Sequence, residues 1–470
     1  MMMQQLIKTT LLLLALLLPG LAMAYDFEVD GIYYNIDGKG ASVTCPVDDY
    51  YSSQYTGAYS GDVVIPDSVT YDGVTYPVTS VGENAFYNCK SLNSVSIPNS
   101  VQSIGSEAFR FCYALTDVNL PNTIRRIEAL AFDNCSSLTS IVIPDSVKDI
   151  MYGTFMQCSS LSSVALPNTL EWIEEAAFSG CSALTDINFP DNLRIMGRDV
   201  FNRTAWLDNQ PDGVVYFGSF ACGYKGESPK TIQIAEGTTH IAEWAFCYLD
   251  SLVNVTIPNS VETISFAAFY TCKSLKDVTL PNHLQGIDPD AFYDCIALTG
   301  INFPNTLKYI ERSAFFGCKS LASIVFPASV EFIGQFSFGY CQALTDVYCH
   351  NSYPIQLFEN PFVLSSGDYS GRTLHVPVGA LENYQYDEEE YGTYYNHGWS
   401  EYFGTIVEMA PGDANGDGQL DVDDVTAIID RILGNITMEC VDANADSNGD
   451  RIIDINDVTD LINKLLGITE

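Results

Sequence analysis

Apolar residues recur along this chain in a pattern of 23 positions. One copy runs from Cys89 to Phe111 and reads C-K-S-L-N-S-V-S-I-P-N-S-V-Q-S-I-G-S-E-A-F-R-F, and Cys112 begins the next copy. The opening cysteine recurs at Cys135, Cys158, Cys181, Cys272, Cys295, Cys318 and Cys341. A unit this short cannot bury its own apolar face, so the period predicts a solenoid in which each unit stacks on the next.

Each unit contains two kinds of predicted element. Leu92, Val95 and Ile97 are spaced as in a short strand that enters a core, and Pro98-Asn99 then favours a turn. Ala108-Phe109 is expected in a short helical turn, so we predict an α/β repeat. The phenylalanine of this turn recurs once per unit and is expected to form a buried aromatic spine. The spine comprises Phe86, Phe109, Phe132, Phe155, Phe178, Phe201, Phe246, Phe269, Phe292, Phe315 and Phe338.

One residue in the middle of each predicted strand is expected on the outer face, because side chains alternate along a strand. We call the set of these residues the mid-strand column. Most of them are small and uncharged, which suits a broad contact with a polypeptide or a glycan. The predicted ligand-binding residues in the column are Ser96, Asn119, Asn188, Gln233, Thr256, Thr279, Asn302 and Tyr348, and Val142, Ala165 and Val325 complete it.

The 23-residue period extends over residues 79–350. Three segments do not keep it, one before this range, one within it and one after it. Residues 25–78 alternate apolar and polar positions around Asp-Gly pairs, which predicts a β-hairpin cap. Residues 205–231 are expected to insert a β-hairpin, either as a binding element or as a purely structural one. Residues 351–410 are expected to close the array and to include a polar, aromatic loop at 386–395.

The cysteines allow two interpretations. The chain has 14 cysteines, and neighbouring turns about 4.8 Å apart would fall within disulfide range. However, side chains in a parallel ladder point alongside one another, and Thr204 and Leu249 take the cysteine position in two units. We therefore predict buried free thiols in the column, and make no prediction for Cys45, Cys222, Cys247, Cys349 and Cys440.

The first 24 residues have the features of a signal peptide. Lys8 precedes an apolar stretch at 11–18, and Ala22-Met23-Ala24 matches a small-residue cleavage site. No later stretch reaches the roughly 18 apolar residues of a membrane helix. We therefore expect a secreted or cell-surface protein without direct membrane insertion.

The net charge of the chain and its lack of known catalytic motifs disfavour several classes of function. The formal net charge is -38, from 59 acidic and 21 basic residues, which disfavours nucleic acid and anionic membranes as partners. The five histidines are dispersed, and no zinc-protease, nucleophile-elbow or phosphate-loop motif occurs. We therefore assign no catalytic residue and predict a protein that is not an enzyme.

The C-terminal 60 residues (411–470) contain two acidic loops 33 positions apart. In the first, carboxylates and amides occupy positions 1, 3, 5, 9 and 12 of a calcium loop, with Gly418 at the sharp turn and the Gln419 carbonyl at position 7. The predicted metal ligands are Asp413, Asn415, Asp417, Gln419, Asp421 and Asp424 in the first loop, and Asp446, Asn448, Asp450, Ile452, Asp454 and Asp457 in the second. We expect two Ca²⁺ ions, the second held less tightly because Arg451 replaces the turn glycine.

An amphipathic helix is expected after each loop, over 425–434 and 458–467. We expect no helix before either loop, which distinguishes this segment from a paired EF-hand.

The repeat phrase L-x-x-V-x-I-P-x-S-V-x-x-I-G-x-x-A-F-x-x-C resembles the BspA-type leucine-rich repeat over residues 79–350, in eleven units. The resemblance implies a curved leucine-rich-repeat solenoid of surface or secreted bacterial proteins, used for adhesion or ligand binding. It does not imply an enzyme.

Residues 412–467 are similar to a type I dockerin, a module that docks to a cohesin on a scaffold or cell surface. The resemblance implies partner-binding residues at Val422, Asp423 and Asp430 in the first copy, and at Ile455, Asn456 and Asn463 in the second. We therefore predict a non-catalytic adhesion protein with a calcium-dependent docking module and an extracellular protein or glycan ligand. The alternative is an accessory component of an extracellular complex that degrades polysaccharides.

Overall fold

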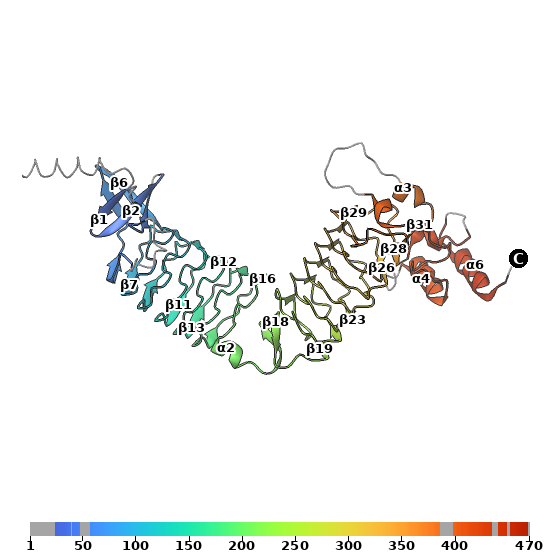
Figure 1. Ribbon diagram of the computed structural model, residues 1–470, viewed down its shortest axis with the longest axis horizontal. Coiled ribbons are helices and arrows are strands. Elements are labelled where there is room, and N and C mark those ends of the chain that lie inside the picture. The colour runs from blue at the N-terminus through green and yellow to red at the C-terminus, as the bar shows by residue number, and fades with distance from the viewer. Residues whose placement is uncertain are drawn as a thin grey trace, which may run out of the picture. The chain divides into compact units, whose positions relative to one another are not determined.

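The computed structural model describes residues 24–38, 40–47, 57–385, 398–434, 440–448 and 452–468 (Figure 1). The chain divides into two compact units, Met1–Asn209 and Gln210–Glu470, which are described in turn. The predicted signal peptide up to residue 23, the predicted loop at 386–395, and Asp450 and Arg451 lie outside the described residues.

The first unit begins with antiparallel hairpins. Strands β1 (Phe27–Val29), β2 (Ile32–Asp37) and β3 (Gly40–Thr44) pair in order, and β5 (Ser68–Tyr71) pairs with β6 (Val74–Val81). Asp30-Gly31 and Asp72-Gly73 form the two-residue turns, all four with positive φ, as this turn type requires. Strand β6 also pairs in parallel with β8, so these hairpins are bonded directly to the first repeat.

Each repeat of the first unit contributes two short parallel strands. One ladder contains β4 (Gly61–Val64), β7 (Leu92–Ser96), β9 (Asp117–Asn119), β11 (Ser140–Val142), β13 (Ser163–Ala165) and β15 (Asp186–Ile187). The other contains β8 (Ser103–Ile104), β10 (Arg126–Ile127), β12 (Asp149–Ile150), β14 (Trp172–Ile173) and β16 (Ile195–Met196). Paired strands keep the 23-residue offset, as in Val95 opposite Val118.

The prediction of a short helical turn in each repeat is wrong. Residues 106–111 form successive turns in which Glu107 and Phe111 have φ of 55° and 63°, and such left-handed residues interrupt an α-helix. Their backbone N–H groups donate to the next repeat, to Ala129 at 3.0 Å and Asp133 at 2.9 Å. The repeats are therefore turns of a β-solenoid, about 13 in all, and not α/β repeats. The cap strand β4 extends the first ladder beyond the predicted units.

The predicted aromatic spine is confirmed in both units. Phe86, Phe109 and Phe132 are fully buried and stack with centroids 4.9 Å and 5.0 Å apart. In the second unit, Phe292 stacks between Phe269 and Phe315 at 5.3 Å and 5.2 Å. Each ring is thereby packed on both faces by the neighbouring repeats.

The predicted free thiols are also confirmed, and the structure adds a reason for cysteine at this position. The nine column cysteines are buried and form no disulfides. Apart from Cys89, the column thiols donate to the carbonyl of a spine phenylalanine 26 residues earlier, as Cys112 does to Phe86 at 3.1 Å and Cys295 to Phe269 at 3.2 Å. Of the two units without cysteine, one has Thr204, whose hydroxyl donates to the Phe201 carbonyl of its own repeat at 2.7 Å, and the other has Leu249, which has no side-chain donor. The position therefore favours a compact side chain, and in most units that side chain is also a hydrogen-bond donor.

Burial should make the column thiols unreactive. Burial raises the pKa of Cys89 to about 11 and that of Cys272 to about 12, so both are protonated at pH 8. We expect Ellman's reagent to leave the column cysteines of the native chain unmodified and to modify them once the chain is unfolded in guanidinium. The partly exposed Cys247 and Cys440 are the internal comparison. Rapid native labelling at Cys89 or Cys272, located by peptide mass spectrometry, would contradict the prediction.

The second unit begins with the predicted inserted hairpin. Strands β17 (Gly213–Phe217) and β18 (Phe220–Lys225) pair antiparallel, and β18 pairs in parallel with β20. The hairpin is therefore part of the stack. The remaining strands of the second ladder are β20 (His240–Ile241), β22 (Thr263–Ile264), β24 (Gly286–Ile287), β25 (Tyr309–Ile310), β27 (Phe332–Ile333) and β29 (Gln356–Leu357).

The mid-strand ladder of the second unit continues into the segment predicted to close the array. It contains β19 (Thr231–Gln233), β21 (Asn254–Thr256), β23 (Asp277–Thr279), β26 (Ser323–Phe326), β28 (Asp346–Cys349), β30 (Thr373–Val376) and β31 (Thr405–Glu408). Helices α2 (Ala205–Asp208), α3 (Leu381–Gln385) and η1 (Trp399–Tyr402) are each a single turn. Trp399 and Phe403 pack near Phe362, which continues the spine beyond Phe338.

Two longer helices follow in the C-terminal segment. Helix α4 (Val422–Leu433) and helix α6 (Ile455–Leu466) each start three residues before the predicted position and end at a left-handed glycine. They pack on one another around Ile428 and Leu461. The expectation of no helix before either loop is wrong for the second loop, because α5 (Asp442–Ala445) precedes it. Its single turn places buried Ala445 in the small core.

Candidate functional site

The mid-strand column lies on the outer side of its ladder. Ser96, Asn119, Gln233, Thr256 and Thr279 are exposed, and the residues next to them along each strand point into the core. Strand register places the column residues directly opposite one another, as in Ser96 with Asn119 and Thr256 with Thr279. The structure therefore brings the predicted residues of each unit into one row.

The row continues past the residues predicted from the sequence. Val64 pairs with Ser96 at one end of the first unit, and His375 and Val407 follow Tyr348 in the second. Val64 is 70% exposed. These three positions precede or follow the 23-residue phrase, so the period did not reveal them. Only around His375, in Thr373-Leu374-His375-Val376, was the alternation of apolar and polar residues an available signal.

Two predicted members differ from the rest. The Asn188 amide pairs with the backbone of Leu166 in the neighbouring repeat, accepting at 2.7 Å and donating at 2.8 Å. Its side chain extends the ladder where β15 has ended, so its polar atoms are already engaged. Asn302 is exposed, but its segment forms no strand.

The C-terminal end of the row carries an aromatic and charged cluster. Tyr348 stacks on His375 with centroids 4.2 Å apart, and His375 Nε2 lies 3.0 Å from Asp346 Oδ1. The His375 ring and the Thr345 hydroxyl hold the pKa of Asp346 below its usual value, despite the opposing effect of burial. This end of the row is therefore chemically distinct from its small, uncharged centre.

The first acidic loop is folded around its last carboxylate. Asp424 is fully buried, and its two oxygens accept from the backbone of Asn415 at 3.1 Å and of Asp421 at 2.8 Å. Asp421 in turn caps helix α4 by accepting from Asp423 at 2.8 Å. Asp417 accepts from the Gln419 N–H at 2.8 Å. Hydrogen bonds of Asp424 and Asp421 thus hold the first loop against the start of helix α4.

Asp413 is the most constrained of these ligands. It is 1% exposed; its Oδ2 accepts from Gly418 at 3.1 Å, whereas the buried Oδ1 has no hydrogen-bond partner. Burial, together with the charges of Asp424 and Asp417, raises the pKa of Asp413 to about 6. A buried carboxylate oxygen without a donor, beside other carboxylates, fits a cation ligand.

The second loop repeats the arrangement 33 residues later. Asp457 is fully buried and accepts from the backbone of Asn448 at 3.2 Å and of Asp454 at 2.9 Å. Asp454 caps α6 by accepting from Asn456 at 2.7 Å. Asp446 and Ile452 flank residues 449–451, which are outside the described part of the chain, so the full ligand set of this loop is not seen together.

The donor set consists of carboxylate, amide and carbonyl oxygens, which suits Ca²⁺ better than a transition metal. Within the described residues, no three His, Cys, Asp or Glu side chains lie close enough together to form a ready metal cluster. A calcium site in the first loop would therefore draw its carboxylates closer and complete its shell with Asn415 and the Gln419 carbonyl. The two calcium sites remain a prediction.

The first loop packs against the last turns of the solenoid. His350 Nε2 lies 3.3 Å from the Gly416 carbonyl, and a Cβ at Gly418 would collide with the Tyr348 ring, so glycine permits this close approach. Asn444 accepts from the Val378 N–H at 3.2 Å and donates to the Asp413 carbonyl at 2.9 Å. The last predicted residue of the mid-strand column, Tyr348, is thus partly covered by the acidic loop.

Helices α4 and α6 expose apolar residues at equivalent positions. Val422 is 68% and Ile455 is 64% exposed, and the predicted partner residues Asp423 and Asn456 beside them are also exposed. Asp430 and Asn463 are half-buried. Further exposed apolar residues that sequence reasoning missed are Ile429, Ile432 and Leu433 on α4, and Ile462, Leu465 and Leu466 on α6. The helical period predicted which face is buried but not that the other face is apolar.

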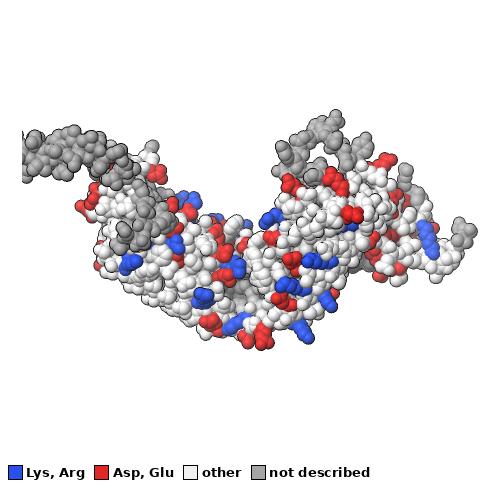
Figure 2. Space-filling model, viewed as in Figure 1, with Lys and Arg blue, Asp and Glu red and all other residues white. Residues whose placement is uncertain are grey.

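Acidic side chains are distributed over the face shown in Figure 2, with single lysines and arginines among them. Within the described residues, none of the helices is long and apolar enough to cross a membrane.

Several solved structures are similar to this chain. A leucine-rich cell surface protein from Faecalibacterium prausnitzii is 26% identical, with 69% of this chain and 94% of that chain covered and a TM-score of 0.35. A leucine-rich repeat protein from Bacteroides ovatus is 24% identical, with 78% and 98% covered and a TM-score of 0.30. One from Bacteroides capillosus is 35% identical, with 29% and 95% covered and a TM-score of 0.24.

No curated protein matches the chain. The family model of the BspA type leucine-rich repeat region matches residues 79–207 and 218–353 in six copies. The matched residues are more than half of the 470, so the chain belongs to the BspA-type leucine-rich repeat family.

Proposed function

We propose that this chain is a non-catalytic binding protein of the cell surface or the extracellular medium. Its mid-strand column binds a protein or glycan ligand, and its C-terminal module docks to a cohesin-like partner in a calcium-dependent manner. The proposal is supported by the repeat family, whose similar structures include a cell surface protein. No catalytic residue is assigned.

The observation that carries the ligand proposal is the row of exposed, small, uncharged side chains in strand register. Thr256 and Thr279 lie opposite one another, with Gln233 next to Thr256 on the other side. A row of this kind presents hydroxyls and an amide at the spacing of a β-ladder without any large side chain to obstruct contact. An extended polymer could therefore contact several turns at once.

The docking proposal is supported by the duplicated loops and by the exposed apolar positions of α4 and α6. Val422 and Ile455 are more than half exposed although each begins a helix whose opposite face is buried. Contiguous exposed apolar side chains on a soluble module favour a protein partner. A cohesin-like partner is the one that the dockerin resemblance implies.

We expect charge placed in the row to weaken ligand binding. The native chain would first be screened by biolayer interferometry against extracellular polysaccharides and surface proteins to identify a ligand. Thr256→Glu combined with Thr279→Glu should then weaken its binding at least about tenfold, because two new carboxylates must be desolvated in the contact.

Gln102→Glu combined with Gln285→Glu is the matched control, because these two exposed residues add the same two charges beside the other ladder, next to β8 and β24. Its affinity should equal that of the native chain. An unchanged affinity in the variant with Thr256→Glu and Thr279→Glu, with the control also unchanged, would show that the ligand binds a different surface.

A further inference from the structure

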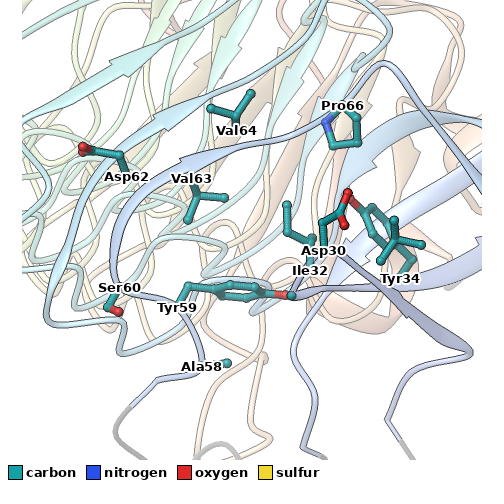
Figure 3. Close-up of a pocket in the computed structure, with 12 residues that line it drawn as sticks. Asp30, Ile32, Tyr34, Ala58, Tyr59, Ser60, Asp62, Val63, Val64 and Pro66 are labelled. Atoms are coloured by element: carbon teal, nitrogen blue, oxygen red, sulfur yellow. The ribbon is translucent and has the colours of Figure 1, made fainter.

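A pocket of about 410 Å³ lies in the first unit, away from both sites considered so far. It is lined by the turn between β1 and β2, by the beginning of β2, and by the segment that includes β4 (Figure 3). In the view of Figure 3, Asp30 and Tyr34 lie on one side, Val63 and Val64 on another, and the Tyr59 ring below them. Its volume is in the range of sites for small ligands.

The Tyr34 hydroxyl is the unusual group of this pocket. Tyr34 is fully buried and stacks on Phe27 with centroids 5.4 Å apart, but its hydroxyl has no hydrogen-bond partner. Phenylalanine would fill the same space without burying a polar atom. An unpaired buried hydroxyl is destabilising, so its presence at a pocket wall suggests a partner that is supplied from outside.

Asp30 provides the complementary group. It is exposed and occupies the two-residue turn with φ of 50°. Burial, together with the charge of Asp30, raises the pKa of Tyr34 to about 12, so the hydroxyl keeps its proton. A buried donor and an exposed carboxylate acceptor therefore line the same pocket.

The rest of the pocket is held in place by other bonds. The Tyr59 hydroxyl donates to the Thr44 carbonyl at 2.8 Å and accepts from the Tyr33 N–H at 3.1 Å. Asp62 accepts from the Ser94 hydroxyl at 2.7 Å, and its carboxylate points away from Asp30 in Figure 3. The polar groups left for a ligand are thus mainly those of Tyr34 and Asp30.

We propose that this pocket binds a neutral sugar residue, one hydroxyl of which accepts from Tyr34 and donates to Asp30. A sugar hydroxyl is both donor and acceptor, as this pair of groups requires. An ammonium group is only a donor and would leave the Tyr34 proton unpaired, and an anionic ligand would be repelled by Asp30. Val63 and the Tyr59 ring offer apolar surface to the sugar carbons.

The test uses the full chain and saturation-transfer NMR titrations with the methyl glycosides of glucose, galactose, mannose, fucose and N-acetylglucosamine. Lysine amide and N-acetylneuraminic acid are the cationic and anionic comparisons. At least one neutral glycoside should bind. Tyr34→Phe should weaken that binding about tenfold, since it removes one hydrogen bond, and Asp30→Asn should weaken it at least about threefold, since the amide still accepts but lacks the charge.

Matched controls exist for both variants. Asp72→Asn changes the equivalent residue of the second Asp-Gly turn, and Tyr402→Phe removes another buried hydroxyl, in the second unit. Both should bind the glycoside like the native chain. Tyr34→Phe should be at least as thermally stable as the native chain, which separates lost binding from lost folding.

Three results would overturn the inference: no neutral glycoside binds, only lysine amide or N-acetylneuraminic acid binds, or binding survives in both pocket variants. The last would place the sugar elsewhere on the chain. None of them bears on the mid-strand column, which is tested separately at Thr256 and Thr279.

Discussion

Replacing Phe292 by alanine should lower the free energy of unfolding of the second unit by about 3–5 kcal/mol. The Phe292 ring is fully buried and stacks on Phe269 and Phe315 within 9° of parallel, at 5.3 Å and 5.2 Å. Alanine removes the contacts of both ring faces at once, and neighbouring turns held by backbone hydrogen bonds cannot collapse to fill the space. The loss therefore includes the transfer and the cavity contributions.

Urea unfolding followed by circular dichroism would measure the change. Phe292→Leu, which retains most of the volume, should cost about 1.5 kcal/mol or less. Tyr248→Ala, which removes a side chain that is 52% exposed, should cost about 0.5 kcal/mol. A loss below about 1 kcal/mol for Phe292→Ala would mean that the spine is not a principal source of stability.

Calcium should supply much of the folding free energy of residues 412–470. This segment has 14 acidic and 3 basic residues, a balance of -11, and buries only a small core around Ile428 and Leu461. At a concentration about 1,000 times its dissociation constant, one bound ion stabilises the folded state by about 4 kcal/mol. We expect the isolated segment to be largely unfolded in chelator and to gain the helix content of α4 and α6 when Ca²⁺ is added.

Asp424→Ala should remove the first site, seen by calorimetric titration of the chelator-treated full chain as the loss of one of two binding events. Asp424 also accepts two backbone hydrogen bonds, so Asp424→Asn, which keeps the shape and an acceptor, separates the lost charge from the lost fold. Asp423→Ala changes an exposed neighbour outside the ligand set and should leave both events unchanged.

Two outcomes would contradict the calcium prediction. The first is equal helix content of the isolated segment with and without Ca²⁺. The second is two undiminished binding events in Asp424→Ala. Either would leave the loops as solvated acidic turns.

The local elements that the sequence predicted correctly all depend on strong short-range signals. The Asp-Gly turn at 30–31 and the inserted hairpin at 213–225 form because their backbone preferences are set by adjacent residues. The helices α4 and α6 were found because apolar residues recur at the helical period and a glycine ends each helix. Their first turns were missed because Asp421 and Asp454 cap the helices earlier than the apolar pattern begins.

The predicted helical turn at Ala108-Phe109 failed for the opposite reason. Alanine and phenylalanine suit a helix locally, but the N–H groups of this segment bond to the next repeat and not within their own turn. Left-handed residues such as Glu107, which no local preference indicates, make those bonds possible. The column cysteines were predicted to be buried side chains that fill space in the core. The sequence could not reveal that their thiols donate to backbone carbonyls of the spine phenylalanines, as Cys112 does to Phe86.

By itself, the sequence determined the period, the aromatic spine, the outward row and the spacing of the acidic loops, because each depends on a repeated side-chain pattern. Only the tertiary structure decided which polar groups are already satisfied. Asn188 belongs to the row but is bonded to Leu166, whereas the buried Asp413 oxygen and the Tyr34 hydroxyl have no partner. Whether a polar atom is free to bind depends on groups from distant parts of the chain, and folding alone brings these together.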